Sequence, residues 1–202
     1  MRFLDLLFPP RVDEKALRGV SDNEFLALMA PRLVPQTRPD TVALFPFHDA
    51  QVRAAIHEAK YHGNERALAL LGGALADYLR DCDDVGRGTS YIVPVPLGRE
   101  RRRKRGFNQA EEVARRAVRE LGMRVETDLL FRTRETVSQI SLPRHEREEN
   151  MRGAFGAAHP ADPSYTFIVI DDVITTGATL QAAIDALQGA GAKHIIPLAL
   201  AH

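Results

Sequence analysis

The order of apolar and polar positions predicts alternating strands and helices. Four bulky apolar residues at 167–170 run into two aspartates, a pattern typical of a central parallel strand covered on both faces. Apolar runs at 91–95 and 195–201 predict two more strands, and residues 124–131 predict another. Apolar residues at helical spacing fill most of the intervals. This alternation indicates an α/β fold with a mostly parallel sheet flanked by helices.

Capping residues mark the expected ends of these helices. Asp49 is a suitable N-cap for a helix that ends at Gly63, and a second helix follows with leucines at core spacing. A third helix, with Asn108 and Glu111 as a cap pair, ends at Gly122. A fourth helix follows the two aspartates. The resulting strand–loop–helix units predict that loops after neighbouring strands emerge at one edge of the sheet.

Two regions depart from this alternation. Residues 1–40 contain several prolines and two weakly helical patches, and we interpret them as an accessory arm or hood beside a domain spanning 41–202. Residues 132–152 are charged and poorly periodic, which predicts an exposed loop or lid that also contributes to the hood. The first ten residues are mostly apolar, but the run is short and is interrupted by Asp5. We therefore expect neither a signal peptide nor a membrane span.

The overall composition excludes several classes of protein. Lysine and arginine together number 27, as do aspartate and glutamate, so no global basic charge indicates extensive nucleic-acid binding. The chain has one cysteine, Cys82, which allows neither an intramolecular disulfide nor a cysteine zinc site. Its seven histidines show no metal-ligand spacing. These features fit a cytoplasmic protein.

The end of the 167–170 strand carries the clearest candidate site. Asp171 and Asp172 follow the apolar run, at a position that we expect to lie outside the packed core. The loop after them contains Thr175, Thr176, Gly177, Ala178 and Thr179. Small side chains, hydroxyls and a glycine at the start of a helix form a suitable cradle for a phosphate group. Carboxylates repel phosphate but accept hydrogen bonds from vicinal hydroxyls, so a ribose 5-phosphate satisfies both parts.

This segment resembles the phosphoribosyl pyrophosphate (PRPP) signature of type I phosphoribosyltransferases. The resemblance implies that Asp171 and Asp172 bind the ribose hydroxyls and that residues 175–179 bind the 5-phosphate. The alternatives are a Walker-B-like or receiver-like acidic strand end and a merely polar strand terminus. No Walker A sequence accompanies the aspartates.

A basic segment follows the strand at 91–95. Its first residues, Leu97, Gly98 and Arg99, lie where the resemblance implies pyrophosphate binding. The candidate anion or nucleic-acid contacts after them are Arg101, Arg102, Arg103, Lys104 and Arg105. These cations suit pyrophosphate or a nucleic-acid backbone, and several of them also suit a solvated charged loop.

Arg105-Gly106-Phe107-Asn108-Gln109 resembles an element of ComF-type proteins, which belong to the phosphoribosyltransferase superfamily and are associated with natural DNA uptake. The resemblance runs from about residue 43 to the C-terminus. Its further matches are Lys60, Tyr61, Gly63, Gln139, Leu142, Arg147, Asn150 and Phe155. For Lys60, Gln139 and Asn150, a packing role is as good an interpretation as ligand binding. The four-cysteine zinc module of typical ComF-like proteins has no counterpart here, so no zinc is expected.

Two functions of different classes follow. The first is an enzyme that transfers the 5-phosphoribosyl group from PRPP to a nitrogenous acceptor and releases pyrophosphate, with Mg²⁺ accompanying PRPP and no direct protein ligand to the metal. The alternative is a non-catalytic nucleotide- or DNA-binding adaptor in natural transformation, whose partners are single-stranded DNA or a DNA-uptake or replication protein. A salvage enzyme or regulator unrelated to DNA uptake is a third interpretation. The sequence identifies neither the acceptor nor a catalytic residue.

Overall fold

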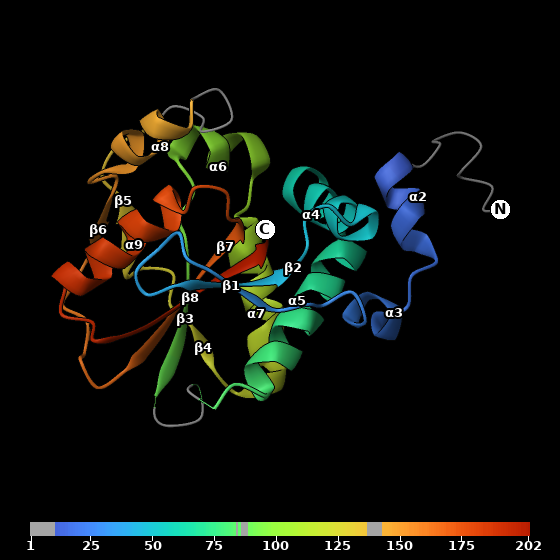
Figure 1. Cartoon of the computed structure of the whole chain (residues 1–202), viewed down its shortest axis with the longest axis horizontal. Helices are drawn as coiled ribbons and strands as arrows, with labels where there is room; N and C mark the ends of the chain where they lie inside the picture. Colours follow the sequence, from blue (N-terminus) through green and yellow to red (C-terminus); the bar gives the residue numbers. More distant parts are fainter. Residues whose placement is uncertain (1–10, 84, 86–88, 137–142) are drawn as a thin grey trace.

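The computed structural model describes residues 11–83, 85, 89–136 and 143–202 (Figure 1). Its helices are α2 (Val12–Arg18), α3 (Asp22–Leu26), α4 (Ala50–His62), α5 (Glu65–Arg80), α6 (Arg99–Arg105), α7 (Gln109–Leu121), α8 (Arg144–Met151) and α9 (Ala178–Gly189). Its strands are β1 (Arg32–Val34), β2 (Thr41–Phe45), β3 (Ser90–Pro94), β4 (Arg124–Val125), β5 (Leu130–Arg132), β6 (Phe155–Ala157), β7 (Thr166–Val173) and β8 (His194–Ala201).

Six strands form the main sheet in the order β1-β2-β8-β7-β3-β4. Strand β1 is antiparallel to β2, and all other neighbours are parallel. Ile168 of the central strand β7 pairs with Ile196 of β8 on one side and Ile92 of β3 on the other. The expected strands at 91–95, 167–170 and 195–201 are therefore confirmed, together with the predicted mostly parallel α/β class.

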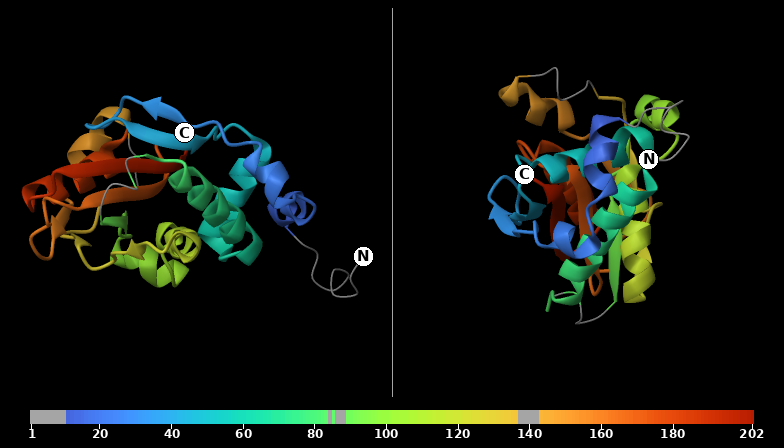
Figure 2. Two further views of the ribbon diagram at one scale, coloured as in Figure 1. Left: turned by 90° about the horizontal axis from the view of Figure 1, so that it is seen from below. Right: turned by 90° about the vertical axis from the view of Figure 1, so that its right-hand side faces the viewer.

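Side chains alternate between two apolar cores, one on each face of the sheet. Ile168 and Ile170 of β7 belong to the core shared with α4, α5 and α7. Phe167 and Val169 point to the opposite face and pack with α9 and the small β5–β6 sheet. Each buried side chain of this size contributes about 1.5–3 kcal/mol to folding. Figure 1 and Figure 2 show the sheet between these two layers, with both faces of β7 covered.

The sequence pattern missed several elements. Strands β1 and β2 were not predicted, and the expected strand at 124–131 is two separate strands, β4 in the main sheet and β5 in a second sheet with β6. The predicted basic loop is the helix α6. It has no apolar stripe and no buried residue, so periodicity gives no helical signal. Its ends are set instead by the N-cap Gly98 and by Gly106, whose φ of 81° is left-handed.

The predicted caps of the long helices are largely confirmed. Asp49 accepts hydrogen bonds from the first-turn amides of α4, and Gly63 ends that helix in the left-handed conformation. Asn108 caps α7 through the amide of Ala110. Glu111 does not complete this cap as expected, because its carboxylate pairs with two arginines. These caps fix the start of each helix at the carboxyl edge of the sheet.

Helices α2 and α3 pack beside α4 and α5 at the end of the molecule away from α8 and α9 (Figure 1). Strand β1 instead joins the edge of the main sheet, and Arg38 after it donates its backbone N–H to Gln181 of α9. Leu17 of α2 and Phe25 of α3 are buried in the adjoining core. Arg11 donates two hydrogen bonds to the buried carboxylate of Glu58, at 2.8 and 2.6 Å. The division of the chain at residue 40 stays a prediction. Among the described helices, none is long and apolar enough to cross a membrane.

Candidate functional site

A cavity of about 610 Å³ opens where the parallel strands β3 and β7 end. Asp171, Asp172 and Val173 of β7 line it, together with Val95, Pro96 and Leu97 after β3. Helices α4, α6 and α8 surround the same end of the sheet (Figure 1, Figure 2). Of the described residues, none in 11–40 lines this cavity, whereas several residues of α4 do. The role of the N-terminal region as a hood stays a prediction.

The two aspartates have different surroundings. Asp172 is 8% exposed, so the expectation that both acids lie outside the packed core is wrong for this residue. Its Oδ2 accepts hydrogen bonds from Lys60 Nζ and from Gln109 Nε2, each at 2.6 Å. Asp171 is half-buried, and its Oδ1 accepts a hydrogen bond from the backbone N–H of Asp172 at 2.8 Å. Asp171 faces the cavity, and within the described part of the chain no cationic side chain hydrogen-bonds to it.

This asymmetry separates the proton affinities of the pair. Burial, reinforced by the charge of Asp172, raises the pKa of Asp171 to about 7. Burial also disfavours the Asp172 anion, but the Lys60 ammonium and the surrounding hydrogen bonds outweigh it, so the pKa of Asp172 is lowered. At neutral pH Asp172 is a fixed anion, whereas Asp171 titrates.

The predicted phosphate loop joins β7 to α9. Gly177 is the N-cap of α9 with a φ of 77°, and the preceding Thr176 accepts a long hydrogen bond of 3.4 Å from the Ala178 amide through its hydroxyl. A Cβ at Gly177 would lie 2.5 Å from the carbonyl oxygen of Gln36. Glycine is therefore required both by its backbone conformation and by the close approach of the β1–β2 turn. Thr175 and Thr179 line the main cavity, which brings the loop beside the two acids as expected.

The predicted pyrophosphate segment forms a second strand–loop–helix turn at the same edge. Gly98 is the N-cap of α6, and the backbone N–H of Arg99 donates to Oε1 of Glu135 at 2.6 Å. A Cβ on Gly98 would lie 2.5 Å from Oε2 of the same carboxylate. An anionic oxygen thus already occupies the position predicted for pyrophosphate. Leu97 lines the cavity, whereas the Arg99 side chain is exposed and does not.

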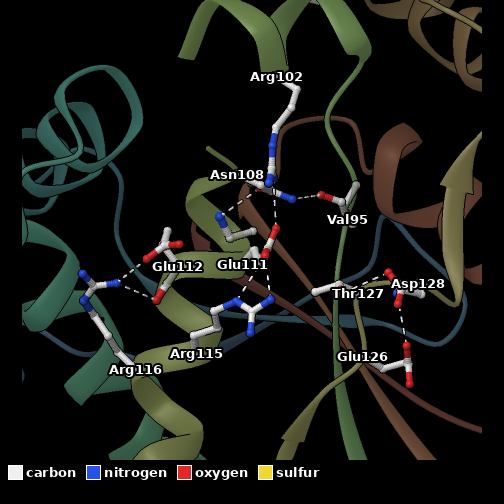
Figure 3. Close-up of polar contacts among 11 residues, drawn as sticks. Val95, Arg102, Asn108, Glu111, Glu112, Arg115, Arg116, Glu126, Thr127 and Asp128 are labelled. Carbon is white, nitrogen blue, oxygen red and sulfur yellow. Dashed lines mark hydrogen bonds and ion pairs between the residues drawn. The ribbon is translucent and has the colours of Figure 1, made fainter. Parts of the chain in front are cut away.

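The remaining cations of α6 point in different directions. Arg101 and Arg105 line the cavity. Arg102 extends from α6 toward α7 and pairs with Glu111 at 3.0 Å (Figure 3). Arg103 and Lys104 are exposed and lie outside the cavity lining. The predicted cation run therefore divides into a cavity-facing part and an outward-facing part.

The same close-up shows how the start of α7 is held against the loop after β3 (Figure 3). The Asn108 side chain donates to the carbonyl of Val95 at 2.9 Å, which ties the start of α7 to the loop after β3 (Figure 3). Asn108 is 4% exposed. Loss of this amide would leave a buried carbonyl without its partner. Asn108 thus holds the strand end in place, and the next residue, Gln109, reaches Asp172.

Arg132 is a cavity residue that sequence reasoning did not single out. Its guanidinium donates to the Pro96 carbonyl at 3.0 Å and to Thr136 Oγ1 at 2.8 Å, and it lies 4.8 Å from the centre of the Phe155 ring. Burial, together with nearby Arg101, lowers the pKa of Arg132 to about 10. The only sequence signal was its place at the start of the predicted lid. This half-buried guanidinium near Asp171 provides a positive charge that its hydrogen bonds hold in place.

Several ComF-like matches converge on the cavity. Lys60 and Gln109 both reach Asp172, and Arg147 lies 3.3 Å from the Thr175 hydroxyl. Gly63 faces the Phe107 ring, which a Cβ would approach to 3.2 Å. Other matches are not in the lining: Phe155 packs beneath Arg132, and the Asn150 carbonyl accepts from Arg134. Gln139 and Leu142 lie outside the described residues.

Among the described residues, His57, Glu58 and His62 place potential metal-ligand atoms within 4.8 Å of one another. Their contacts account for this arrangement without a metal. Arg11 and Asn64 donate to Glu58, and His57 lies 2.9 Å from Asp13. The Arg11–Glu58 ion pair and the His57–Asp13 contact join the start of the described chain and α2 to α4.

Comparison with known proteins identifies the class that this fold and site define. Residues 71–202 match the phosphoribosyl transferase domain, and the chain belongs to this family. It is 34% identical over 127 residues to DNA utilization protein YhgH of Escherichia coli O6:H1, covering 62% of this chain and 56% of that protein. It is 33% identical over 106 residues to Competence protein F of Haemophilus influenzae, covering 52% and 46% respectively.

These matches confirm the resemblance to ComF-like phosphoribosyltransferases. The chain spans about half the length of the curated relatives that it matches. The matched family region begins within α5 and includes β3, β7, α9 and β8, which carry the acids and both glycine turns. Helix α4, which supplies Lys60, lies before it.

Proposed function

We propose that this protein binds PRPP with Mg²⁺ and transfers its 5-phosphoribosyl group to a nitrogenous acceptor, releasing pyrophosphate. One observation carries this proposal. Of the described residues, six cationic side chains line the cavity beside the two aspartates: Arg53, Lys60, Arg101, Arg105, Arg132 and Arg147. This excess of positive charge suits a ligand with several phosphate charges, and the acids suit its ribose hydroxyls.

The residues have distinct roles in this proposal. Asp171 and Asp172 accept hydrogen bonds from the ribose hydroxyls, and their negative charge favours the cationic character that C1 acquires. The amides and hydroxyls of residues 175–179 hold the 5-phosphate. A bond forms between the acceptor nitrogen and C1 while the C1–oxygen bond breaks, and pyrophosphate leaves with the electron pair. The acceptor nitrogen then loses its proton.

Positive charge on the leaving-group side favours departure. Arg101 and Arg132 provide it from the cavity wall, and the Arg99 amide is available when Glu135 moves away. Mg²⁺ enters with PRPP as part of the substrate and neutralises phosphate charge. The cavity fits this form, because Asp171 and Thr175 offer oxygen atoms to metal-bound water, while Asp172 is already engaged by Lys60.

Calorimetric titration with PRPP and Mg²⁺ tests the ligand, and pyrophosphate release against a panel of bases and amines tests the reaction. We expect PRPP binding that requires Mg²⁺ and release that depends on one acceptor class. Absence of PRPP binding by the folded protein would refute the proposal. Binding without release by any acceptor would limit the function to a sensor or adaptor.

A second candidate function is DNA binding in natural transformation. The outward-facing cations Arg103 and Lys104 support it, as does similarity to proteins named for competence and DNA utilization. In this role the partner is single-stranded DNA or a DNA-uptake or replication protein, and the protein acts in the cytoplasm. The outward-facing surface and the cavity can serve the two functions separately.

A further inference from the structure

The turn between α6 and α7 brings the last residue of one helix beside the first residue of the next. Arg105 ends α6 and Gln109 begins α7. Gly106 between them has a φ of 81°, and the Asn108 side chain ties the turn to the Val95 carbonyl. Across this turn, Nη1 of Arg105 donates a hydrogen bond to Oε1 of Gln109 at 3.0 Å. A side-chain contact therefore joins the two helix ends.

The Gln109 amide lies between a cation and an anion. Its Nε2 donates to Oδ2 of Asp172 at 2.6 Å, while its Oε1 accepts from Arg105. A guanidinium only donates hydrogen bonds and an ionised carboxylate only accepts them, so one orientation of the amide satisfies both partners. The reversed amide would place its oxygen against the carboxylate and its NH₂ group against the guanidinium. Gln109 is 3% exposed, so little water would relieve these two unfavourable contacts.

The orientation of this amide matters because Asp172 has few acceptor positions left. Lys60 and Gln109 both bind Oδ2, and the backbone N–H of Val173 donates to Oδ1 at 2.7 Å. A carboxylate offers about four acceptor positions, shared between its two oxygens. Oδ2 is thus filled, and the open position lies on Oδ1. If Gln109 stopped donating, a position on Oδ2 would open and the carboxylate would be free to turn.

Arg105 is itself held on the side of the amide away from Asp172. Its guanidinium is half-buried and lies over the Tyr61 ring, 5.2 Å from the ring centre. In the described part of the chain, no carboxylate forms an ion pair with Arg105. The Gln109 oxygen therefore meets no competing side-chain anion for this guanidinium among the described residues.

We infer that Arg105 is a positioning residue of the ribose site, because it holds the Gln109 amide in the orientation that donates to Asp172. The amide then keeps the Asp172 carboxylate turned so that its open acceptor position meets a ribose hydroxyl. The inference rests on the proposed function, which places the ribose hydroxyls at Asp171 and Asp172. Arg105 acts on the sugar through Gln109 and not by touching it.

The first test needs no ligand. Solvent exchange of the Gln109 side-chain amide protons is measured by NMR in the free protein. We expect Arg105→Met to speed this exchange about tenfold or more, because the amide loses the partner that orients it. Arg105→Lys, which keeps a donor-only side chain, should keep the exchange slow, as should Arg119→Met, an exposed arginine in the last turn of α7. Unchanged exchange in Arg105→Met would overturn the inference.

The second test is a double-mutant cycle in which calorimetry measures the affinity for PRPP with Mg²⁺. We expect Arg105→Met to weaken binding about tenfold or more in the wild type. This loss should shrink by about fivefold or more when Gln109→Met is already present, because the route through the amide is gone. The remaining loss is the effect of the Arg105 charge on phosphate. Equal losses in both backgrounds would show that Arg105 acts on the ligand directly, which overturns the inference.

The outcomes separate this inference from the proposed function. Binding of PRPP together with unchanged exchange or equal losses overturns the positioning role and leaves the proposed function standing. If PRPP fails to bind the folded wild type, the proposed function falls and the ribose role of Arg105 falls with it, while the exchange rates still decide whether Arg105 orients Gln109. Thermal unfolding checks that each variant is folded. If Gln109→Met does not fold, Gln109→Asn, whose side chain is too short to reach both partners, takes its place.

Discussion

The β7–α9 and β3–α6 turns are built alike but present different surfaces to a ligand. Each joins a central parallel strand to a helix through a glycine N-cap, Gly177 in one and Gly98 in the other. Helix α9 has 12 residues and small side chains at its start, whereas α6 has seven residues and a glutamate on its first amide. The Gly177 turn has the shape of an anion site. The Gly98 turn already binds an anion, the Glu135 carboxylate.

Because of this difference, we expect the two phosphate-bearing ends of PRPP to bind in different ways. In the proposed complex, the 5-phosphate would meet a loop whose shape is constrained by the close approach of Gly177 and Gln36. Pyrophosphate would have to displace the Glu135 carboxylate from the Arg99 amide. We therefore expect the 5-phosphate end to anchor the ligand and the pyrophosphate end to control its affinity.

The largest effect is expected from damage to the preformed turn. Gly177→Ala places a Cβ 2.5 Å from the Gln36 carbonyl on a backbone with a φ of 77°. We expect a loss of about 2–4 kcal/mol in the free energy of unfolding and a loss of PRPP binding of about 100-fold. Denaturant unfolding and calorimetry measure both quantities.

Gly73→Ala in the interior of α5 is the matched control, because nothing lies within 4 Å of the position that its methyl group would take and alanine favours helix. This variant should raise the free energy of unfolding by about 0.5–1 kcal/mol and leave PRPP affinity unchanged. Full stability and full binding in Gly177→Ala would show that the turn is not preformed as described.

Asp171→Asn should change binding and stability in opposite directions. The pKa of Asp171 is raised from 3.8 to about 7, so the folded state binds the proton more tightly than the unfolded state. The stabilising contribution of the protonated carboxyl is fully present below about pH 4 and is lost as the pH rises through about 7. At pH 8 the free energy of unfolding of the variant should therefore be about 1–3 kcal/mol larger than that of the wild type. At pH 4 this difference should vanish.

The same variant should bind PRPP about 10–100-fold more weakly at pH 8, because a charged acceptor of ribose hydrogen bonds is lost. Thermal unfolding across this pH range and calorimetry provide the two readings. A variant that is less stable than the wild type at pH 8 would contradict the assigned charge state of Asp171.

Removal of the Glu135 carboxylate from the Arg99 amide should strengthen PRPP binding. Glu135→Ala frees the Arg99 amide and removes a negative charge from the predicted pyrophosphate position. We expect PRPP to bind about fivefold tighter, equivalent to about 1 kcal/mol. Glu100→Ala is the control, since Glu100 is an exposed acid in the first turn of the same helix. Equal gains in both variants would indicate general charge repulsion instead of competition at one amide.

The smallest effect is expected for the outward-facing cations of α6. Arg103→Ala combined with Lys104→Ala should reduce the slope of log affinity for single-stranded DNA against log salt by about 0.7 for each lost phosphate contact. PRPP affinity should stay the same, because neither residue lines the cavity. Lys193→Ala, an exposed cation just before β8, should alter neither property. An unchanged slope in the double variant would show that Arg103 and Lys104 do not contact DNA phosphates.

The sequence predicted the parts of the site that are contiguous along the chain. The apolar run, the aspartates and the Gly177 loop lie in one segment, so a ligand chemistry could be predicted for them from the sequence alone. Lys60 and Gln109 reach Asp172 from α4 and α7, and only the folded chain brings them together. The same holds for the cavity-facing side of α4, because the sequence predicted the helix and did not reveal that Arg53, Lys60 and Tyr61 line a cavity.

Three further features had no local signal. Helix α6 consists of charged residues and is fixed by its glycine ends, so the pattern predicted a loop. Glu135 and Arg132 lie in a charged, aperiodic segment, and their contacts to Arg99 and Pro96 depend on how that segment crosses the ends of the strands. Tertiary placement, and not residue type, determines their roles.

A crystal structure of the protein with PRPP and Mg²⁺ would decide whether the cavity is a PRPP site. We predict the ribose hydroxyls at Asp171 and Asp172, the 5-phosphate on residues 175–179, and pyrophosphate at the Arg99 amide in place of the Glu135 carboxylate. A PRPP molecule bound elsewhere, or one bound in this cavity with its 5-phosphate away from the Gly177 turn, would refute the proposed binding mode.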